Sequence, residues 1–200
     1  MTSLRERKKE RTRQALIDAA VELFQRRGYD KTTVADIAAA ADIATRTFFG
    51  YFASKEELLF PESDERVRAA VKAIEERKPE DTPADLLLRA LHDVGEASGE
   101  MVSPLAAVRV QLIQTVPAVR GRALQLQLDA QREIAGHLVA AFPGELDRVT
   151  AGALVGAFIG AVSGALQALM DNPTTNANAN ANARADLREA TAIALRPWRR

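Results

Sequence analysis

The chain has 200 residues, of which 47% are hydrophobic and 27% are charged, a balance typical of a globular protein with one large or two small domains. Cysteine is absent, which excludes disulfide scaffolds, cysteine-ligated metal sites and thiol nucleophiles. The formal net charge is zero, but residues 1–55 carry a net charge of +4 and the rest of the chain −4. A basic N-terminal region followed by an acidic remainder favours an N-terminal module that binds a polyanion.

The first predicted helix follows a basic segment. Apolar residues at a helical spacing place this helix over residues 13–27, and Gly28 supplies a stop at its end. The preceding segment, residues 5–13, holds six Lys or Arg and two Glu, and it lacks the apolar core of a secretory signal. We expect a cytoplasmic protein in which this segment is either a solvated tail or an arm that contacts phosphates or the minor groove of DNA.

Two short helices are predicted next. The first covers residues 33–40, with Thr32 as its cap, and the second covers residues 44–51, after a break at residues 41–43. This spacing is typical of a helix-turn-helix motif, in which the second helix enters the major groove of DNA. A small helical lobe without a ligand has the same spacing, so the pattern alone leaves both possibilities open.

The predicted second helix of this motif carries side chains that suit DNA. An arginine can pair with guanine through two hydrogen bonds, and a threonine or phenylalanine can contact a thymine methyl group. No acidic residue is present among the positions that we expect to be exposed, which are Thr45, Arg46, Thr47, Phe49, Gly50 and Tyr51.

The rest of the chain is also predicted to be helical. A capping-box pattern over residues 54–57 predicts a fourth helix, which Pro61 breaks or kinks, and we expect Ser63 to cap a restart that runs to about Arg77. Further helix starts are predicted at Thr82-Pro83, Ser103-Pro104 and Pro117. No segment shows a sustained β pattern, so we expect an all-α fold.

Two stretches resemble the tetracycline-repressor (TetR) family, and the resemblance covers about residues 12–60. They are GYDKTTVADIA, residues 28–38, and TFFGYFASKEEL, residues 47–58. The Thr-Phe-Phe-x-Tyr-Phe form is similar to the actinobacterial group that includes mycofactocin-system regulators. The resemblance implies an N-terminal helix-turn-helix domain over residues 1–53 and a C-terminal domain for dimerisation and ligand binding over residues 54–200.

The resemblance also implies roles for individual residues. Thr33 matches a phosphate-contacting threonine, and a helix N-terminus suits an anion physically. Thr47 and Phe49 match positions that face the groove, and Tyr51 and Lys55 match positions that contact the DNA backbone.

Two positions depart from the family pattern. Asp42 stands in the turn where the family usually has glycine, and aspartate tolerates the left-handed conformation better than most residues. Phe49 replaces the more usual tyrosine, so a phosphate hydrogen bond is lost there while stacking or methyl contact remains.

Residues 149–170 form a 22-residue segment without a charged side chain. A helix of this length spans about 33 Å, enough for a membrane, but ten of the residues are Ala or Gly and drive insertion poorly, so we expect no membrane span. In the TetR family the last two helices form the dimer interface, and burial within one subunit is the alternative. Four glycines spaced four apart would line that interface: Gly152, Gly156, Gly160 and Gly164.

The effector pocket is predicted only from helical periodicity, and the same apolar residues fit a plain core. We expect an effector that is apolar or of acyl type, and Arg109 and His92 would be its polar anchors if it is anionic, such as an acyl thioester or a fatty acid. The candidate lining residues are Leu88, Leu91, His92, Val108, Arg109 and Leu112.

Four Asn-Ala repeats end a segment, residues 172–183, that we expect to be a mobile linker before a last helix over residues 184–195. The sequence contains no phosphate-binding loop, nucleophile elbow or zinc-protease motif, and we expect no cofactor, catalytic residue or metal site.

The sequence as a whole predicts a homodimeric transcriptional regulator, a repressor that a small ligand releases from a palindromic operator, with coupling through the fourth helix. A helical dimeric binding module without DNA function is the main alternative, and an enzyme that uses the body pocket is a second.

Overall fold

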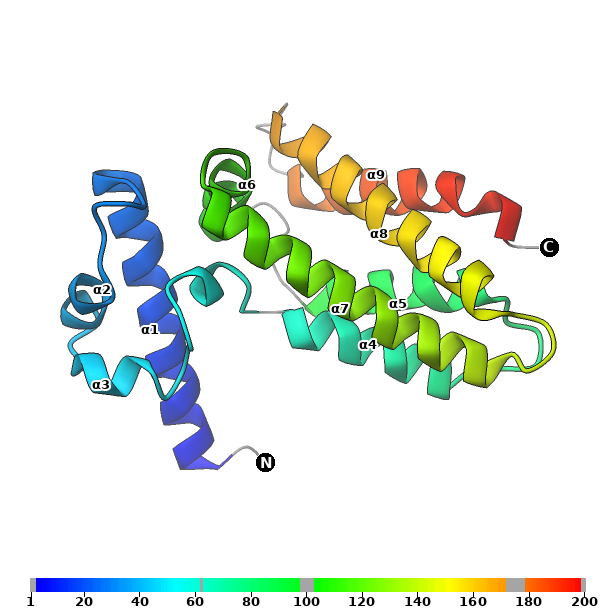
Figure 1. Cartoon of the computed structure of the whole chain (residues 1–200), viewed down its shortest axis with the longest axis horizontal. Coiled ribbons are helices and arrows are strands. Elements are labelled where there is room, and N and C mark those ends of the chain that lie inside the picture. The colour runs from blue at the N-terminus through cyan, green and yellow to red at the C-terminus, as the bar shows by residue number, and fades with distance from the viewer. Residues whose placement is uncertain (1–2, 62, 98–102, 172–178, 199–200) are drawn as a thin grey trace. The chain divides into compact units, whose positions relative to one another are not determined.

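The computed structural model describes residues 3–61, 63–97, 103–171 and 179–198. Across these ranges the regular secondary structure is helical and contains no strand, which confirms the all-α prediction (Figure 1).

The chain divides into two compact units. Unit 1 comprises Met1–Pro61 and Ser103–Ala123, and unit 2 comprises Glu62–Val102 and Leu124–Arg200. Residues 54–61 and Ser103–Ala123 therefore belong to the same compact unit as the N-terminal helices. The predicted functional division after residue 53 stays a prediction.

Helix α1 (Leu4–Arg27) is longer than predicted, because it also contains the basic segment. Ser3 caps it: the Ser3 hydroxyl accepts from the Glu6 N–H at 3.2 Å, and the Glu6 carboxylate accepts from the Ser3 N–H at 2.7 Å. Gly28 ends the helix at φ +80°, as predicted. Residues 4–13 are therefore helical, and contact of this segment with DNA stays a prediction.

Helices α2 (Val34–Ala40) and α3 (Thr45–Phe48) lie close together beside α1, as a helix-turn-helix motif requires (Figure 1). The residue that caps α2 is Thr33 and not Thr32. Thr32 is buried instead, and its hydroxyl donates to the Gly28 carbonyl at 2.9 Å. Asp42, in the turn, adopts the left-handed conformation with φ +53°, as its sequence position predicted.

The predicted fourth helix is interrupted. Residues Glu56–Leu59 form a short 3-10 helix, η1, and α4 (Ser63–Glu75) begins only after it. Phe60 leaves the helical region at φ −128°, and Pro61 lacks the N–H that a continuing helix needs. The expected break near Pro61 and restart at Ser63 are thus confirmed, whereas an α-helix that begins within residues 54–57 is wrong, and coupling through this segment stays a prediction.

Unit 1 is completed by α6 (Pro104–Thr115), which packs on α1 and η1, and by the first residues of α7 (Pro117–Ala141). Both helices begin at the predicted prolines. The Ser103 hydroxyl caps α6 by accepting from the Ala106 N–H at 3.1 Å.

Unit 2 contains α4, α5 (Pro83–Ala97), the remainder of α7, α8 (Arg148–Asp171) and α9 (Ala179–Ala194), followed by the 3-10 turn η2 (Arg196–Trp198). Helix α4 packs along α5, and α8 along α9 (Figure 1).

The last helix begins five residues earlier than predicted. Residues 179–183, the end of the Asn-Ala repeats, belong to α9, so the linker prediction is wrong there, and residues 172–178 lie outside the described ranges. The reason is a buried seam with a period of four, which includes one alanine of the repeats: Ala183, Leu187, Thr191 and Leu195.

Candidate nucleic-acid interface

The surface of α3 and the turn after it is polar and solvent-exposed. Phe48 is fully buried and anchors the segment, while Phe49 is 58% exposed. The Arg46 side chain makes no hydrogen bond or ion pair with any described residue, so its guanidinium is available for a ligand. Tyr51 is half-buried, and the other predicted contact residues of this segment are exposed: Thr45, Arg46, Thr47, Phe49 and Gly50.

Aromatic packing holds this segment on α1. The Phe48 ring lies edge-on to Phe49 at a centroid distance of 5.3 Å and 5.9 Å from the Phe52 ring. The Arg13 guanidinium lies 5.1 Å from the Phe52 ring centroid and donates to the Pro61 carbonyl at 2.8 Å. Arg13 therefore contacts the segment between α3 and α4 at Phe52 and at Pro61, and it is not part of a free arm.

Thr33 is exposed, but its hydroxyl has a partner within the chain. It donates to the Asp36 carboxylate at 2.6 Å, and that carboxylate also accepts from the Thr33 N–H at 2.8 Å. These hydrogen bonds lower the pKa of Asp36. A phosphate contact of Thr33 therefore remains a prediction, and it would compete with Asp36 for the same donors.

Lys55 is held by the backbone of its own unit. Its Nζ donates to the carbonyl oxygens of Tyr29 and Thr32, at 2.9 Å each, and lies 3.8 Å from the Tyr29 ring centroid. Burial lowers the pKa of Lys55. An ammonium group has three donors, so one remains for the predicted phosphate contact. Sequence reasoning missed this structural role.

Tyr29 and Glu56 form a second link in the same place. The Tyr29 hydroxyl donates to the Glu56 carboxylate. Burial, together with this hydrogen bond, raises the pKa of Tyr29 well above its usual value of 10. Burial is the largest single effect on Glu56 and raises its pKa, but the hydrogen bonds from Tyr29, Ser54 and the backbone, together with the charge of Lys55, outweigh burial and lower the Glu56 pKa.

Glu57 connects the end of the recognition segment, which is α3 and the turn after it (residues 45–52), to α7. One carboxylate oxygen accepts from the Ala53 N–H at 2.7 Å, and the other from the Arg122 Nη2 at 2.8 Å. Both charged side chains are 28% exposed. The capping-box pattern had marked Glu57 as a cap, and the ion pair with a residue 65 positions later had no local signal in the sequence.

The basic segment at the start of α1 is an exposed helical surface. All of residues 4–11 are exposed, with Glu6 engaged in the cap. Side chains on a helix are presented as a rigid row, so this segment suits contacts with phosphate oxygens better than entry into a narrow minor groove.

The predicted pocket residues fall into two groups. Leu88 and Leu91 of α5 are half-buried in unit 2, and the Nδ1 of the exposed His92 lies 2.9 Å from the Arg188 Nη1 of α9. The α6 residues belong to unit 1: Val108 and Leu112 are buried against α1, and Arg109 donates to the Leu59 carbonyl at 3.3 Å.

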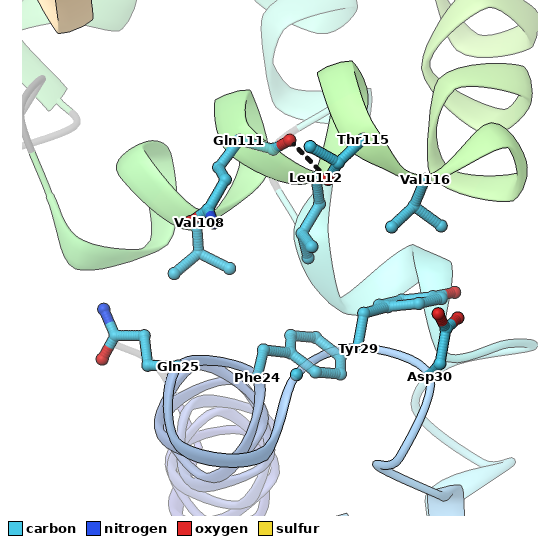
Figure 2. Close-up of a pocket in the computed structure, with 10 residues that line it drawn as sticks. Phe24, Gln25, Tyr29, Asp30, Val108, Gln111, Leu112, Thr115 and Val116 are labelled. Atoms are coloured by element: carbon cyan, nitrogen blue, oxygen red, sulfur yellow. Dashed lines mark hydrogen bonds between the residues drawn. The ribbon is translucent and has the colours of Figure 1, made fainter.

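A cavity of about 360 Å³ lies between the end of α1 and α6, both in unit 1. Figure 2 shows its two sides, with Phe24 and Tyr29 opposite Val108, Leu112 and Val116. Two of the six residues predicted for an effector pocket, Val108 and Leu112, therefore line a cavity. This cavity belongs to unit 1 and not to unit 2, where the pocket was expected.

The glycine row of α8 has two different environments. At the N-terminal end, the Gly152 carbonyl accepts from the Gln131 side chain at 3.0 Å, and a Cβ on Gly156 would lie 3.1 Å from the same Gln131 nitrogen. A Cβ on Gly160 or Gly164 would meet nothing within 4 Å among the described residues. The row thus lies against α7 at one end and is open at the other.

Helix α8 is long and apolar enough to cross a membrane, by length and composition alone, although the core helices of soluble proteins pass the same test. Only 17% of its most apolar window is buried within this chain. Among the described residues no group of three or more His, Cys, Asp and Glu is arranged to hold a metal ion.

Comparisons with known proteins agree with this geometry. The family described as bacterial regulatory proteins, tetR family, matches residues 16–60. The chain is 33% identical over 150 residues to the HTH-type transcriptional regulator TcmR of Streptomyces glaucescens, covering 72% of this chain and 66% of TcmR. It thus spans slightly less than two thirds of that relative.

A shorter similarity, 44% identity over 52 residues, relates 26% of the chain to 26% of the mycofactocin biosynthesis transcriptional regulator MftR of Mycobacterium tuberculosis. The narrower resemblance to mycofactocin-system regulators stays a prediction, because this match leaves most of both chains uncovered.

A solved structure shares the fold over nearly the whole chain. FadR of Thermus thermophilus, described as a TetR-family transcriptional repressor in complex with lauroyl-CoA, matches with a TM-score of 0.53 and 20% identity, covering 92% of this chain and 91% of FadR. Given the family match on the helix-turn-helix and the relationship to TcmR, the chain belongs to the tetR family of bacterial regulatory proteins.

Proposed function

We propose that the protein is a sequence-specific DNA-binding transcriptional regulator, a homodimeric repressor that a small molecule releases from its operator. The exposed surface of α3 carries this proposal. It offers a guanidinium, hydroxyls and an exposed aromatic ring, it contains no acidic side chain, and it is anchored by the buried Phe48.

Two kinds of DNA contact are divided between the site residues. Arg46, Thr47 and Phe49 are proposed to read base edges, with Thr45 and Gly50 beside them. Positioning on the phosphates is proposed for Thr33, for Tyr51, for the free donor of Lys55 and for the basic start of α1.

The proposed dimer interface is the open part of the glycine row. Helix α8 has no charged side chain between residues 149 and 170, and few of its residues are fully buried within its own chain. Gly160 and Gly164 let a partner backbone approach closely, which offsets the cost of about 1 kcal/mol that each glycine imposes on a helix interior. This use of α8 replaces a membrane span and suits a cytoplasmic protein.

The proposed effector is apolar or of acyl type. FadR of T. thermophilus, which shares the fold, was crystallised with lauroyl-CoA. In this chain Leu88, Leu91 and His92 on α5 are the remaining candidates in unit 2. A ligand that binds only the arrangement unable to hold DNA shifts the population of dimers away from the operator.

The proposal is tested by selecting bound sequences from a random duplex library with the full-length protein, then measuring affinity for the selected and a scrambled site at several salt concentrations. Arg46→Ala should cost about 1–3 kcal/mol on the selected site and relax the preference. Arg132→Ala, which removes an exposed guanidinium of unit 2, is the matched control and should change neither. The proposal is wrong if wild-type protein binds both sites equally.

A further inference from the structure

The cavity between α1 and α6 lies in the same unit as the helix-turn-helix, and the proposed function does not use it. Its volume of about 360 Å³ is within the range of small-molecule pockets, about 300–1,000 Å³. Half of its lining comes from the end of α1 and the turn that follows, and half from α6 and its C-terminal residue (Figure 2).

The two facing sides of the cavity are apolar. On one side, the rings of Phe24 and Tyr29 lie 5.2 Å apart with a tilt of 44°, and both residues are at least 93% buried. On the other side stand Val108, Leu112 and Val116, spaced by four residues so that they form one stripe (Figure 2). A flat or branched apolar group fits between an aromatic and an aliphatic side.

The one charged side chain that lines the cavity is Asp30, at the Tyr29 end (Figure 2). Its carboxylate is exposed and accepts no hydrogen bond from the described residues. Lys55, the nearby cation, directs two of its donors to backbone carbonyls, and a second carboxylate, Glu56, lies beyond the Tyr29 hydroxyl. The opposite rim carries the uncharged amides of Gln25 and Gln111.

We propose that this cavity is a second ligand site, and that it takes a small amphipathic cation: an apolar or aromatic body of about ten heavy atoms with one ammonium group. The body lies between Phe24 and Leu112, and the ammonium pairs with Asp30. Such a ligand fills the groove between α1 and α6 and therefore acts on the unit that holds the recognition segment, independently of an effector in unit 2.

Three probes of one shape and different charge test the site: 2-phenylethylammonium, 2-phenylethanol and phenylacetate, titrated into full-length protein and followed by calorimetry or by NMR. The cation should bind more tightly than the alcohol, by up to about fivefold, which is what one exposed ion pair supplies, and the anion should bind most weakly. Equal affinity for all three, or no binding of the cation at millimolar concentration, would overturn the proposal.

Two variants and one control test whether the probes bind in this cavity. Asp30→Asn keeps the shape and should remove the preference for the cation over the alcohol. Thr115→Trp adds a bulky group at the exposed rim and should abolish binding of both, while Gln114→Trp, on the same helix but outside the cavity, should leave it unchanged. Binding that persists in Thr115→Trp, or a cation preference that survives Asp30→Asn, would refute the assignment. None of these measurements involves DNA, so a failure here is distinct from a failure of the proposed regulator function.

Discussion

At the scale of single residues, several hydrogen bonds of unit 1 that involve charged side chains lie within residues 53–57, directly after the recognition segment. Lys55 and Glu56 form hydrogen bonds with residues 29 and 32, and Glu57 accepts a hydrogen bond from the Ala53 N–H within the stretch itself. A hydrogen bond to a charged group contributes about 1.5–3 kcal/mol when it is well formed, less where solvent reaches it. These positions therefore fix how α3 is presented.

The Tyr29 phenol offers a direct test of this cluster. The chain has two tyrosines, so the variant Tyr51→Phe leaves Tyr29 as the sole phenol. Because burial and the hydrogen bond to Glu56 stabilise the protonated form, ultraviolet titration of this variant should place the Tyr29 midpoint well above pH 10. A midpoint near pH 10 in protein that is still folded would show that the phenol is neither buried nor bonded to Glu56.

The same shift predicts the direction of a stability change. A group whose pKa is higher in the folded state favours folding below its unfolded pKa, and this contribution is lost as the pH rises through the folded pKa. The free energy of unfolding should thus fall above about pH 10, and Tyr29→Phe should show a smaller fall. Denaturant titrations at pH 8 and above pH 10 compare the two proteins, with Tyr51→Phe as the control.

At the scale of elements, the Glu57–Arg122 pair joins η1 to α7, and we expect it to stabilise unit 1. Truncating either side chain removes an ion pair between two groups that are each 28% exposed, so Glu57→Gln and Arg122→Met should each destabilise the protein. The double variant should lose less than the sum, with a coupling energy on the order of 0.5–1 kcal/mol because both groups are about a quarter exposed.

A double-mutant cycle from urea unfolding measures this coupling. The exposed pair Arg132–Asp129 on α7, with side chains 78% and 58% exposed, is the matched control and should show no measurable coupling. Additive effects of the Glu57 and Arg122 changes would mean that the ion pair does not join these elements in solution.

Helix starts were predictable from the sequence because their signals are local. Thr82 caps α5 through hydrogen bonds to Asp85, three residues away, and Ser103 caps α6 in the same way. The exposed positions of α3 followed from helical periodicity for the same reason. The break marked by Pro61 and the restart at Ser63 were predictable in the same way, although the backbone leaves the helix at Phe60, one residue before the proline.

Features that depend on contacts between distant parts of the chain were not predictable. Periodicity identified Val108 and Leu112 as apolar positions on one helix face, but it gave no means of knowing that this face packs on α1. The Lys55 bonds to residues 23 and 26 positions earlier leave no pattern either. The Asn-Ala repeats were read as a linker on composition, whereas one of their alanines fills a buried seam of α9.

The open end of the α8 glycine row leads to a prediction about assembly. Gly160→Leu combined with Gly164→Leu should convert the dimer to a monomer, because the added side chains keep a partner backbone away, while their Cβ atoms meet nothing within 4 Å among the described residues of their own subunit. Leucine also favours the helix more than glycine does, so the fold should persist. Gly136→Leu, at an exposed and equally open glycine of α7, is the control. Sedimentation and circular dichroism give the two readouts, and a double variant that stays dimeric would place the interface elsewhere.

At the scale of the whole molecule, dimerisation and DNA reading are linked by symmetry. Two copies of α3 related by a twofold axis meet successive major grooves only if the half-sites lie one helical turn apart, about 34–36 Å, or a multiple of it. Each copy contributes the same base contacts, so the affinity for a full palindrome depends on both halves being intact.

The most direct measurement is the affinity of the full-length dimer for the selected palindrome, for the same duplex with one half-site scrambled, and for a fully scrambled duplex, at one fixed salt concentration near 150 mM. We predict that the palindrome binds at least about a thousandfold more tightly than the fully scrambled duplex, with the half-scrambled site between them. Indistinguishable affinities for the three duplexes would contradict the central claim that this protein reads DNA sequence as a symmetric dimer.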